Sequence, residues 1–311
     1  MDKLLIFFLL LGSYLYANEP ISPLPTTVEG LNLQKAELGK LLFFDPILSA
    51  DKSISCHSCH SFDDGGADPR KVSLGVQDRK GSIQSPTVYN SRYNFRQFWN
   101  GRASSLEDQA SGPLFTHEEM AMTDTKILQR LNSNAFYQAR FKKVYRRPKI
   151  TIKDTINAIV EFEKALITPN SRFDRYLRGE LELTQAEKQG YAAFKSLGCI
   201  TCHNGINIGA NSFQKLGLFK PYPYDPKYQD RYALTNKEYH KNVFKVPTLR
   251  NISLTAPYFH DAKAKTLDEA VKLMATHNLG IKLSQKNADS LVSFLKSLEG
   301  ERPKILDSNA H

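Results

Sequence analysis

The sequence predicts an all-α protein built of two similar units in tandem, and three observations support this class. Its 311 residues, 41% of them hydrophobic, suffice for one large core or two ordinary domains. The pattern Cys-x-x-Cys-His occurs twice, beginning at Cys56 and at Cys199, each time after an amphipathic helical stretch with Ala-Glu near its start. Convincing alternating strands are absent. We therefore expect two helical domains, 18–168 and 169–300, with the 301–311 tail able to join the first.

Start and stop signals place the individual helices along the chain. In the first half, one helix begins near residue 35 and others are expected at 105–112 and 152–167, the last between Thr151 and Pro169. In the second half, capping boxes and closing glycines place three more. They are a helix from Thr184-x-x-Glu187 to Gly198, one at 267–279 from Thr266-x-x-Glu269 to Gly280, and one at 285–298 closed by Gly300. The proline-rich stretch 210–234 is expected to be loop.

The first residues, "MDKLLIFFLLLGSYLYANEP", are typical of a secretory signal. A charged start, an apolar run from Leu4 to Leu11 and the small Ala17 predict a signal peptide at 1–17, cleaved near Ala17. An uncleaved anchor is the alternative, because Asp2 cancels the charge of Lys3. Export implies the periplasm, an oxidising compartment in which idle cysteines would pair as disulfides.

All four cysteines lie in the two motifs, and this favours c-type haem attachment. In such a motif the two thiols form thioethers with the porphyrin and the following histidine ligates the iron. A zinc site shared by the four cysteines and a redox dithiol are the alternatives. The net charge of +10 comes without a basic run or nucleic-acid motif, so it indicates steering of an acidic redox partner and no nucleic-acid role. The predicted cofactor residues are the thiols of Cys56, Cys59, Cys199 and Cys202 and the iron ligands His60 and His203.

Two long segments then carry a family resemblance: "FRQFWNGRASSLEDQASGPLFTHEEMAM" (95–122) and "FKVPTLRNISLTAPYFHDA" (244–262). Together with the two haem motifs in this order, they resemble the bacterial di-haem cytochrome c peroxidase family, to which MauG-type enzymes are related. The resemblance extends from about Glu37 to Gly300. It implies two cytochrome c-like domains in tandem, each wrapped round one covalent c-type haem.

The resemblance also implies roles for single residues. The N-terminal haem would bind hydrogen peroxide, with Glu119 and Gln109 as catalytic residues and Pro113 in the pocket. Trp99 would lie between the haems. Met274 would be the distal ligand of the C-terminal haem, although an isolated helical methionine is more often a core residue. From their chemistry alone, a carboxylate near the iron can take a proton from peroxide and return it to the leaving oxygen, and Arg102 and Arg250 suit haem propionates.

Two departures from the family pattern affect the prediction. Many members carry a histidine in a loop after the first motif that blocks the peroxide site until the other haem is reduced. Here the segment is "VSLGVQD" and the position is Val76, which cannot ligate iron, so we expect an enzyme that needs no reductive activation. Gln84 replaces an asparagine of a calcium site to which Thr255 and Pro257 would also contribute, and this change weakens the case for calcium.

The expected activity is that of a cytochrome-c peroxidase, H2O2 + 2e⁻ + 2H⁺ → 2H2O. The resemblance implies a monohaem cytochrome c or a cupredoxin as the small soluble electron donor, and a homodimer. A di-haem electron carrier and a MauG-like oxidase of a partner protein are the alternatives.

Overall fold

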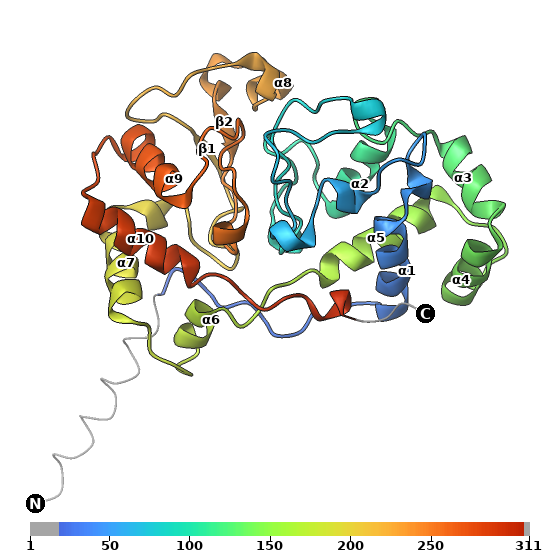
Figure 1. Ribbon diagram of the computed structural model, residues 1–311, viewed down its shortest axis with the longest axis horizontal. Helices are drawn as coiled ribbons and strands as arrows, with labels where there is room; N and C mark the ends of the chain where they lie inside the picture. Colours follow the sequence, from blue (N-terminus) through green and yellow to red (C-terminus); the bar gives the residue numbers. More distant parts are fainter. Residues whose placement is uncertain (1–18, 308–311) are drawn as a thin grey trace, which may run out of the picture.

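The computed structural model describes residues 19–307, and this part of the chain is mostly helical, as predicted. Figure 1 shows two lobes side by side. The first holds α1 (Leu33–Phe44), α2 (Leu106–Phe115), α3 (Asp124–Asn132), α4 (Ala135–Tyr145) and α5 (Ile152–Ala165). The second holds α6 (Arg172–Leu177), α7 (Gln185–Ser196), α8 (Tyr232–Thr235), α9 (Leu267–Met274), α10 (Gln285–Lys296) and the strands β1 (Phe213–Lys215) and β2 (Val243–Lys245). The predicted signal peptide and residues 308–311 lie outside the described residues.

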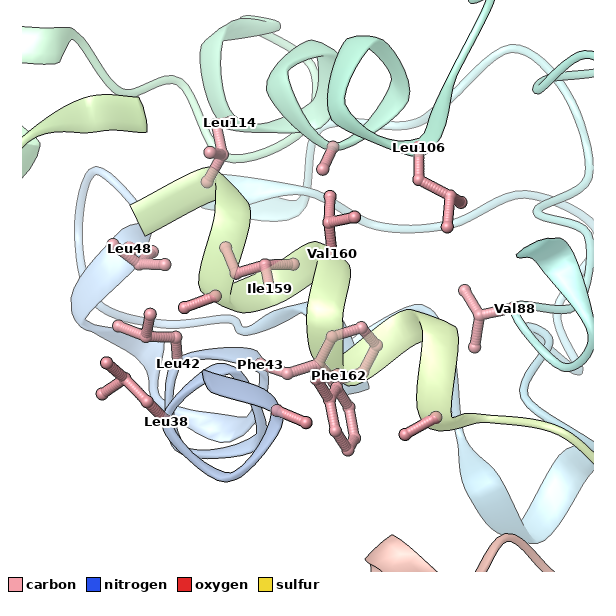
Figure 2. Packing of buried hydrophobic residues seen from close by; sticks show 14 of the residues in the cluster. Leu38, Leu42, Phe43, Leu48, Val88, Leu106, Leu114, Ile159, Val160 and Phe162 are labelled. Carbon is pink, nitrogen blue, oxygen red and sulfur yellow. The ribbon is translucent and has the colours of Figure 1, made fainter. Parts of the chain in front are cut away.

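The first lobe has its core where α1 crosses α5 (Figure 2). Leu42 and Phe162 are fully buried there, and each buried side chain of this size contributes about 1.5–3 kcal/mol. The helices approach closely because Gly39 lies at the crossing, where a Cβ would be 1.8 Å from the carbonyl oxygen of Ala158. This crossing fixes the C-terminal end of α1, from which the chain runs to the first motif.

The second lobe repeats this arrangement with α7 and α10. Gly190 lies at their crossing, where a Cβ would be 1.9 Å from the carbonyl oxygen of Ser290, and Phe194 and Phe294 pack beside it. In both lobes, then, the helix before the Cys-x-x-Cys-His motif crosses a later helix at a glycine. The structure thus has the tandem organisation that the duplicated motif predicts.

Several predicted helix boundaries agree with the structure. Thr184 and Thr266 form the expected capping boxes, and Gly198 (φ 89°) and Gly280 (φ 69°) follow their helices in the left-handed conformation. Gly300 has another role: α10 ends at Lys296, and Gly300 instead packs against the carbonyl oxygen of Thr168. The sequence analysis did not predict α3, α4, α6, α8 or the antiparallel β1–β2 pair.

The two ends of the described chain cross to the other lobe. Ile21 belongs to the second core, Leu24 N–H donates to Asp174 Oδ1 (3.1 Å), and Arg250 donates to Ser22 O (2.9 Å). Residues 21–24 therefore contact the second lobe, which differs from their assignment to a domain 18–168. At the other end, Ile305 packs into the first core. Within residues 19–307 no helix has the length and apolarity needed to cross a membrane.

Candidate active site

One cavity of about 910 Å³ lies between the lobes, and both Cys-x-x-Cys-His motifs line it. Its other walls come from α2, α5, α9, β2 and the loops that follow each motif. This volume is in the range of cofactor sites, and the wall is largely apolar with a few polar side chains. The four cysteines form no disulfide, and burial raises the pKa of the Cys56 thiol to about 12 and of the Cys199 thiol to about 11. Among the described residues no group of three or more His, Cys, Asp and Glu side chains is arranged to hold a metal ion.

In the first motif a short 3₁₀ turn over Cys56–Ser58 presents the side chains to the cavity. His60 Nδ1 lies 3.2 Å from the carbonyl oxygen of Gly66. A hydrogen bond from Nδ1–H to this carbonyl leaves Nε2 as the free ligand nitrogen. Burial lowers the pKa of His60, which keeps the imidazole neutral and able to bind iron.

The second motif has the same short turn, but its histidine Nδ1 is buried without a hydrogen-bond partner among the described residues. The turn Cys199–Thr201 follows Gly198 directly, and Cys199, Cys202 and His203 line the cavity. Burial lowers the pKa of His203 to about 4, so this imidazole is also neutral. The donor set of each motif, two thiols and one neutral imidazole in an apolar chamber, fits a c-type haem.

The predicted catalytic residues Gln109 and Glu119 both line the cavity. Glu119 lies near the first motif, where burial and, to a smaller extent, the Glu119 charge raise the pKa of Cys56 and Cys59, and we call this part of the cavity the first chamber. Ser105 caps α2, which carries Gln109 on the cavity wall, and the turn after α2 brings Glu119 there. Burial raises the pKa of Glu119, and the positive charge of Arg102 opposes this rise. Arg102 is itself held with its guanidinium 3.4 Å from the Phe98 ring centroid. Pro113, inside α2, also lines the cavity.

Trp99 and Met274 line the cavity as well. The Trp99 indole N–H donates to the carbonyl oxygen of Gln84 (2.8 Å), and its ring meets Phe244 and His260 edge to face at 6.3 and 6.2 Å. Met274 ends α9 and packs against the cluster that contains Phe244. Both side chains therefore face the cavity that the two motifs share. The roles of Trp99 between the haems and of Met274 as an iron ligand stay predictions.

Other predicted residues are placed differently. Arg250 is outside the cavity wall, because it pairs with Asp174 (2.9 Å) and donates to Ile206 O (2.6 Å) inside the second lobe. Val76 is buried, but its side chain is outside the wall too, and its N–H donates to Glu119 O (2.9 Å). The predicted calcium residues Gln84, Thr255 and Pro257 lie on the wall, and calcium stays a prediction.

Two buried residues of the wall with charged side-chain types were not predicted from the sequence: Glu163 of α5 and Lys245 of β2. Glu163 lies three and four positions after the buried Val160 and Ile159, on the apolar face of its helix, and this helical spacing was a usable signal. Lys245 stands in the apolar run "VFKVP", which by itself is a weak signal.

The fold and the cavity define a helical protein of two lobes in which two Cys-x-x-Cys-His motifs face one shared cavity. Comparisons with known proteins agree: the family model "Di-haem cytochrome c peroxidase" matches residues 33–182. Cytochrome c551 peroxidase of Nitrosomonas europaea is 46% identical over 92% of this chain and 86% of that protein, and the cytochrome c peroxidase Ccp of Escherichia coli is 44% identical over 92% of this chain and 62% of that protein. Among solved structures, a MauG-like protein associated with microbial copper homeostasis matches with a TM-score of 0.79 at 27% identity, covering 91% of this chain and 94% of that chain.

The chain belongs to the di-haem cytochrome c peroxidase family. It is therefore an oxidoreductase that acts on peroxide, and its family membership implies two haem cofactors.

Proposed function

We propose that this protein is a periplasmic enzyme that reduces hydrogen peroxide to water with electrons from a small soluble cytochrome c or cupredoxin, and that it does so without prior reduction. The observation that carries the proposal is the grouping of Glu119, Gln109 and Arg102 at the chamber of the first motif. The N-terminal sequence supports export, and the cysteine pairs support covalent attachment of both haems. The positive net charge suits an acidic donor.

The haem iron supplies the redox chemistry, and the protein supplies proton transfer and orientation. Glu119 takes a proton from one peroxide oxygen and returns it to the other as the oxygen–oxygen bond breaks. The Gln109 side chain donates a hydrogen bond that orients peroxide. Arg102 keeps Glu119 ionised at lower pH than burial alone would allow, because its charge lowers the carboxyl pKa. The apolar wall excludes water from this site.

The absence of a blocking histidine supports activity without prior reduction. Among the described residues, the histidines that line the cavity are His60, His203 and His260. His260 stacks on Phe244 (4.3 Å) beside Trp99, within the second lobe. His117, the nearest histidine to Glu119 in sequence, is 70% exposed and lies 3.6 Å from Glu118. No other described histidine lies on the cavity wall, and this supports an unblocked site at the first motif.

The decisive experiment compares peroxide turnover by the fully oxidised and the half-reduced protein, with an electron paramagnetic resonance spectrum of the oxidised form. We expect one high-spin haem and immediate turnover with a ferrocytochrome donor. Two low-spin haems and turnover only after half-reduction would contradict the open site. Two low-spin haems and no turnover in either form would instead favour a di-haem electron carrier.

Glu119→Gln tests the catalytic assignment. Because the amide cannot carry the proton, kcat/KM for peroxide should fall by about 10²–10⁴-fold. Glu118→Gln is the matched control, since the Glu118 side chain is 58% exposed and should tolerate the change. Both variants should retain two haems in a pyridine haemochrome assay. Equal turnover of the two variants would remove Glu119 from the mechanism.

A further inference from the structure

Among the lysines of residues 19–307, Lys245 is the one that is buried, and no acidic side chain of these residues pairs with it. It is 7% exposed, and every other described lysine is more exposed. None of the ion pairs or side-chain hydrogen bonds within residues 19–307 involves its ammonium group. Burial lowers its pKa to about 8, so the side chain still carries a proton at neutral pH. An uncompensated charge in such a place costs several kcal/mol unless an anion binds it.

The backbone places Lys245 on the cavity wall beside the second motif. Its N–H donates to the carbonyl oxygen of Trp99 (2.7 Å), and the residue before it, Phe244, stacks on His260. Two residues after Lys245, the chain passes close to Gly209. A Cβ added to Gly209 would lie 2.3 Å from the carbonyl oxygen of Pro247 and 3.3 Å from His203 Nδ1. The segment that follows β2 therefore passes close to Gly209, which lies next to the histidine of the second motif.

With the haems placed as in the proposed function, a haem propionate would be an anion within reach of this cavity. The sequence predicted Arg102 and Arg250 as partners of the haem propionates. Arg102 lies near Glu119 at the first chamber, and Arg250 is bound to Asp174, so neither is placed to bind a propionate of the second haem. No described acidic side chain pairs with Lys245, so its charge is free to meet a ligand group. A buried ammonium is a strong point donor to a carboxylate.

We propose that the Lys245 ammonium binds a propionate of the haem carried by Cys199, Cys202 and His203, and that its charge raises the reduction potential of this haem. The inference rests on the haem placement in the proposed function. A positive charge beside a haem favours the reduced iron, which carries one charge less. Lys245 is then a cofactor-binding residue on the electron-input side of the enzyme.

Lys245→Met tests this with a redox titration that uses neither peroxide nor donor protein. The methionine keeps the length and apolar body of the side chain and removes the charge. We expect the midpoint potential of the C-terminal haem to shift to lower values, by more than that of the N-terminal haem. Lys282→Met, which removes the same charge from an exposed position of the second lobe, should leave both potentials unchanged. Unchanged potentials in Lys245→Met would overturn the proposal.

Lys245→Arg separates the effect of the charge from the effect of packing. It also keeps the proposal testable if the Lys245→Met variant loses its haem. It retains the cation, so we expect two haems and a potential close to that of the parent. A fall in potential as large as in Lys245→Met, or loss of the second haem from both variants, would overturn the proposal because packing alone would then explain the effect. Failure of peroxide turnover in the parent protein would count against the proposed function only, since the potentials are measured without turnover.

Discussion

Glu119, which is half-buried, and Glu163, which is buried, are two carboxyl groups in the wall of the same cavity, and their surroundings separate their chemistry. Burial raises the pKa of both, but Arg102 opposes the rise at Glu119, whereas the charge of Glu107 adds to it at Glu163. Glu163 Oε2 has no hydrogen-bond partner among the described residues, and its pKa reaches about 8. Glu119 is thus the group suited to exchange a proton during the reaction, and Glu163 is held neutral at pH 7.

Arg102→Gln should shift the pH profile of peroxide reduction. As a base, Glu119 must be ionised, so the acid limb of kcat/KM follows its pKa. Loss of the Arg102 charge raises that pKa, and the limb should move to higher pH. Steady-state rates between pH 4 and pH 8 measure this, with exposed Arg96→Gln as the control. An acid limb that stays in place would show that another group controls it.

Glu163→Gln should change stability in a pH-dependent way. The unfolded chain releases this proton near the ordinary value of 4.5, whereas the folded protein holds it until about pH 8. Ionising the buried group therefore destabilises the parent as pH rises from 4.5 through 8, and the variant should gain up to about 5 kcal/mol relative to it at pH 9. Near pH 4.5 the two should differ little.

Urea unfolding of the haem-loaded proteins at pH 4.5 and pH 9 gives this comparison. Glu182→Gln is the control, because the Glu182 side chain is 78% exposed and should give the same difference at both pH values. A Glu163→Gln effect that is equal at the two pH values would mean that the carboxyl group does not hold its proton in the folded state.

Sequence reasoning at this scale found the residues that stand in long motifs and missed those defined by burial. Glu119 and Gln109 were identified because their segment resembles a family. Lys245 and Glu163 have no motif of their own, and only the packing of the chain around the cavity makes their charges significant.

At the scale of elements, the loop around Val76 holds the turn that carries Glu119. Val76 N–H donates to Glu119 O, and a Cβ on Gly75 would lie 2.0 Å from Glu118 O and 2.7 Å from Glu119 O. The backbone of Gly75 (φ −86°) is open to any residue, so only the contact with the turn requires a glycine there. The loop therefore positions Glu119.

Gly75→Ala should displace this turn and impair catalysis. The methyl group would push the backbone of Glu118 and Glu119 away from the first chamber, and a shift near 1 Å can cost about 10²-fold in rate. Peroxide turnover and haem content together measure the effect. Gly81→Ala in the same loop is the matched control, since its Cβ would meet no atom closer than 3.5 Å. If both variants turn over like the parent, the loop has no positioning role.

The elements found from sequence are those with strong local signals. The capping boxes at Thr184 and Thr266 satisfy helix N–H groups without help from the rest of the fold, so α7 and α9 could be predicted. The β1–β2 pair could not, because each strand has only three residues and its partner lies about 30 residues away.

At the scale of the whole molecule, Thr168 joins the two lobes. Its Oγ1 accepts hydrogen bonds from Asn90 Nδ2 (2.8 Å) and Asn251 Nδ2 (2.7 Å), and its own N–H donates to Asn90 Oδ1 (3.0 Å). Asn90 belongs to the first half of the sequence and Asn251 to the second, and all three residues are at most 2% exposed. The sequence predicted a seam near this residue from Pro169, but the network depends on side chains about 80 positions away and needed the structure.

Thr168→Val tests how far this network fixes one lobe against the other. Valine fills the same space but leaves two buried amide groups without an acceptor, which should destabilise the protein by about 2–4 kcal/mol. Thr168→Ser keeps the hydroxyl group and should cost less than about 1 kcal/mol. Urea unfolding at neutral pH measures both, and a valine variant as stable as the serine variant would show that the hydroxyl network contributes little to stability. Because the cavity lies between the lobes, the valine variant should also change the midpoint potentials of the haems, whereas the serine variant should keep them.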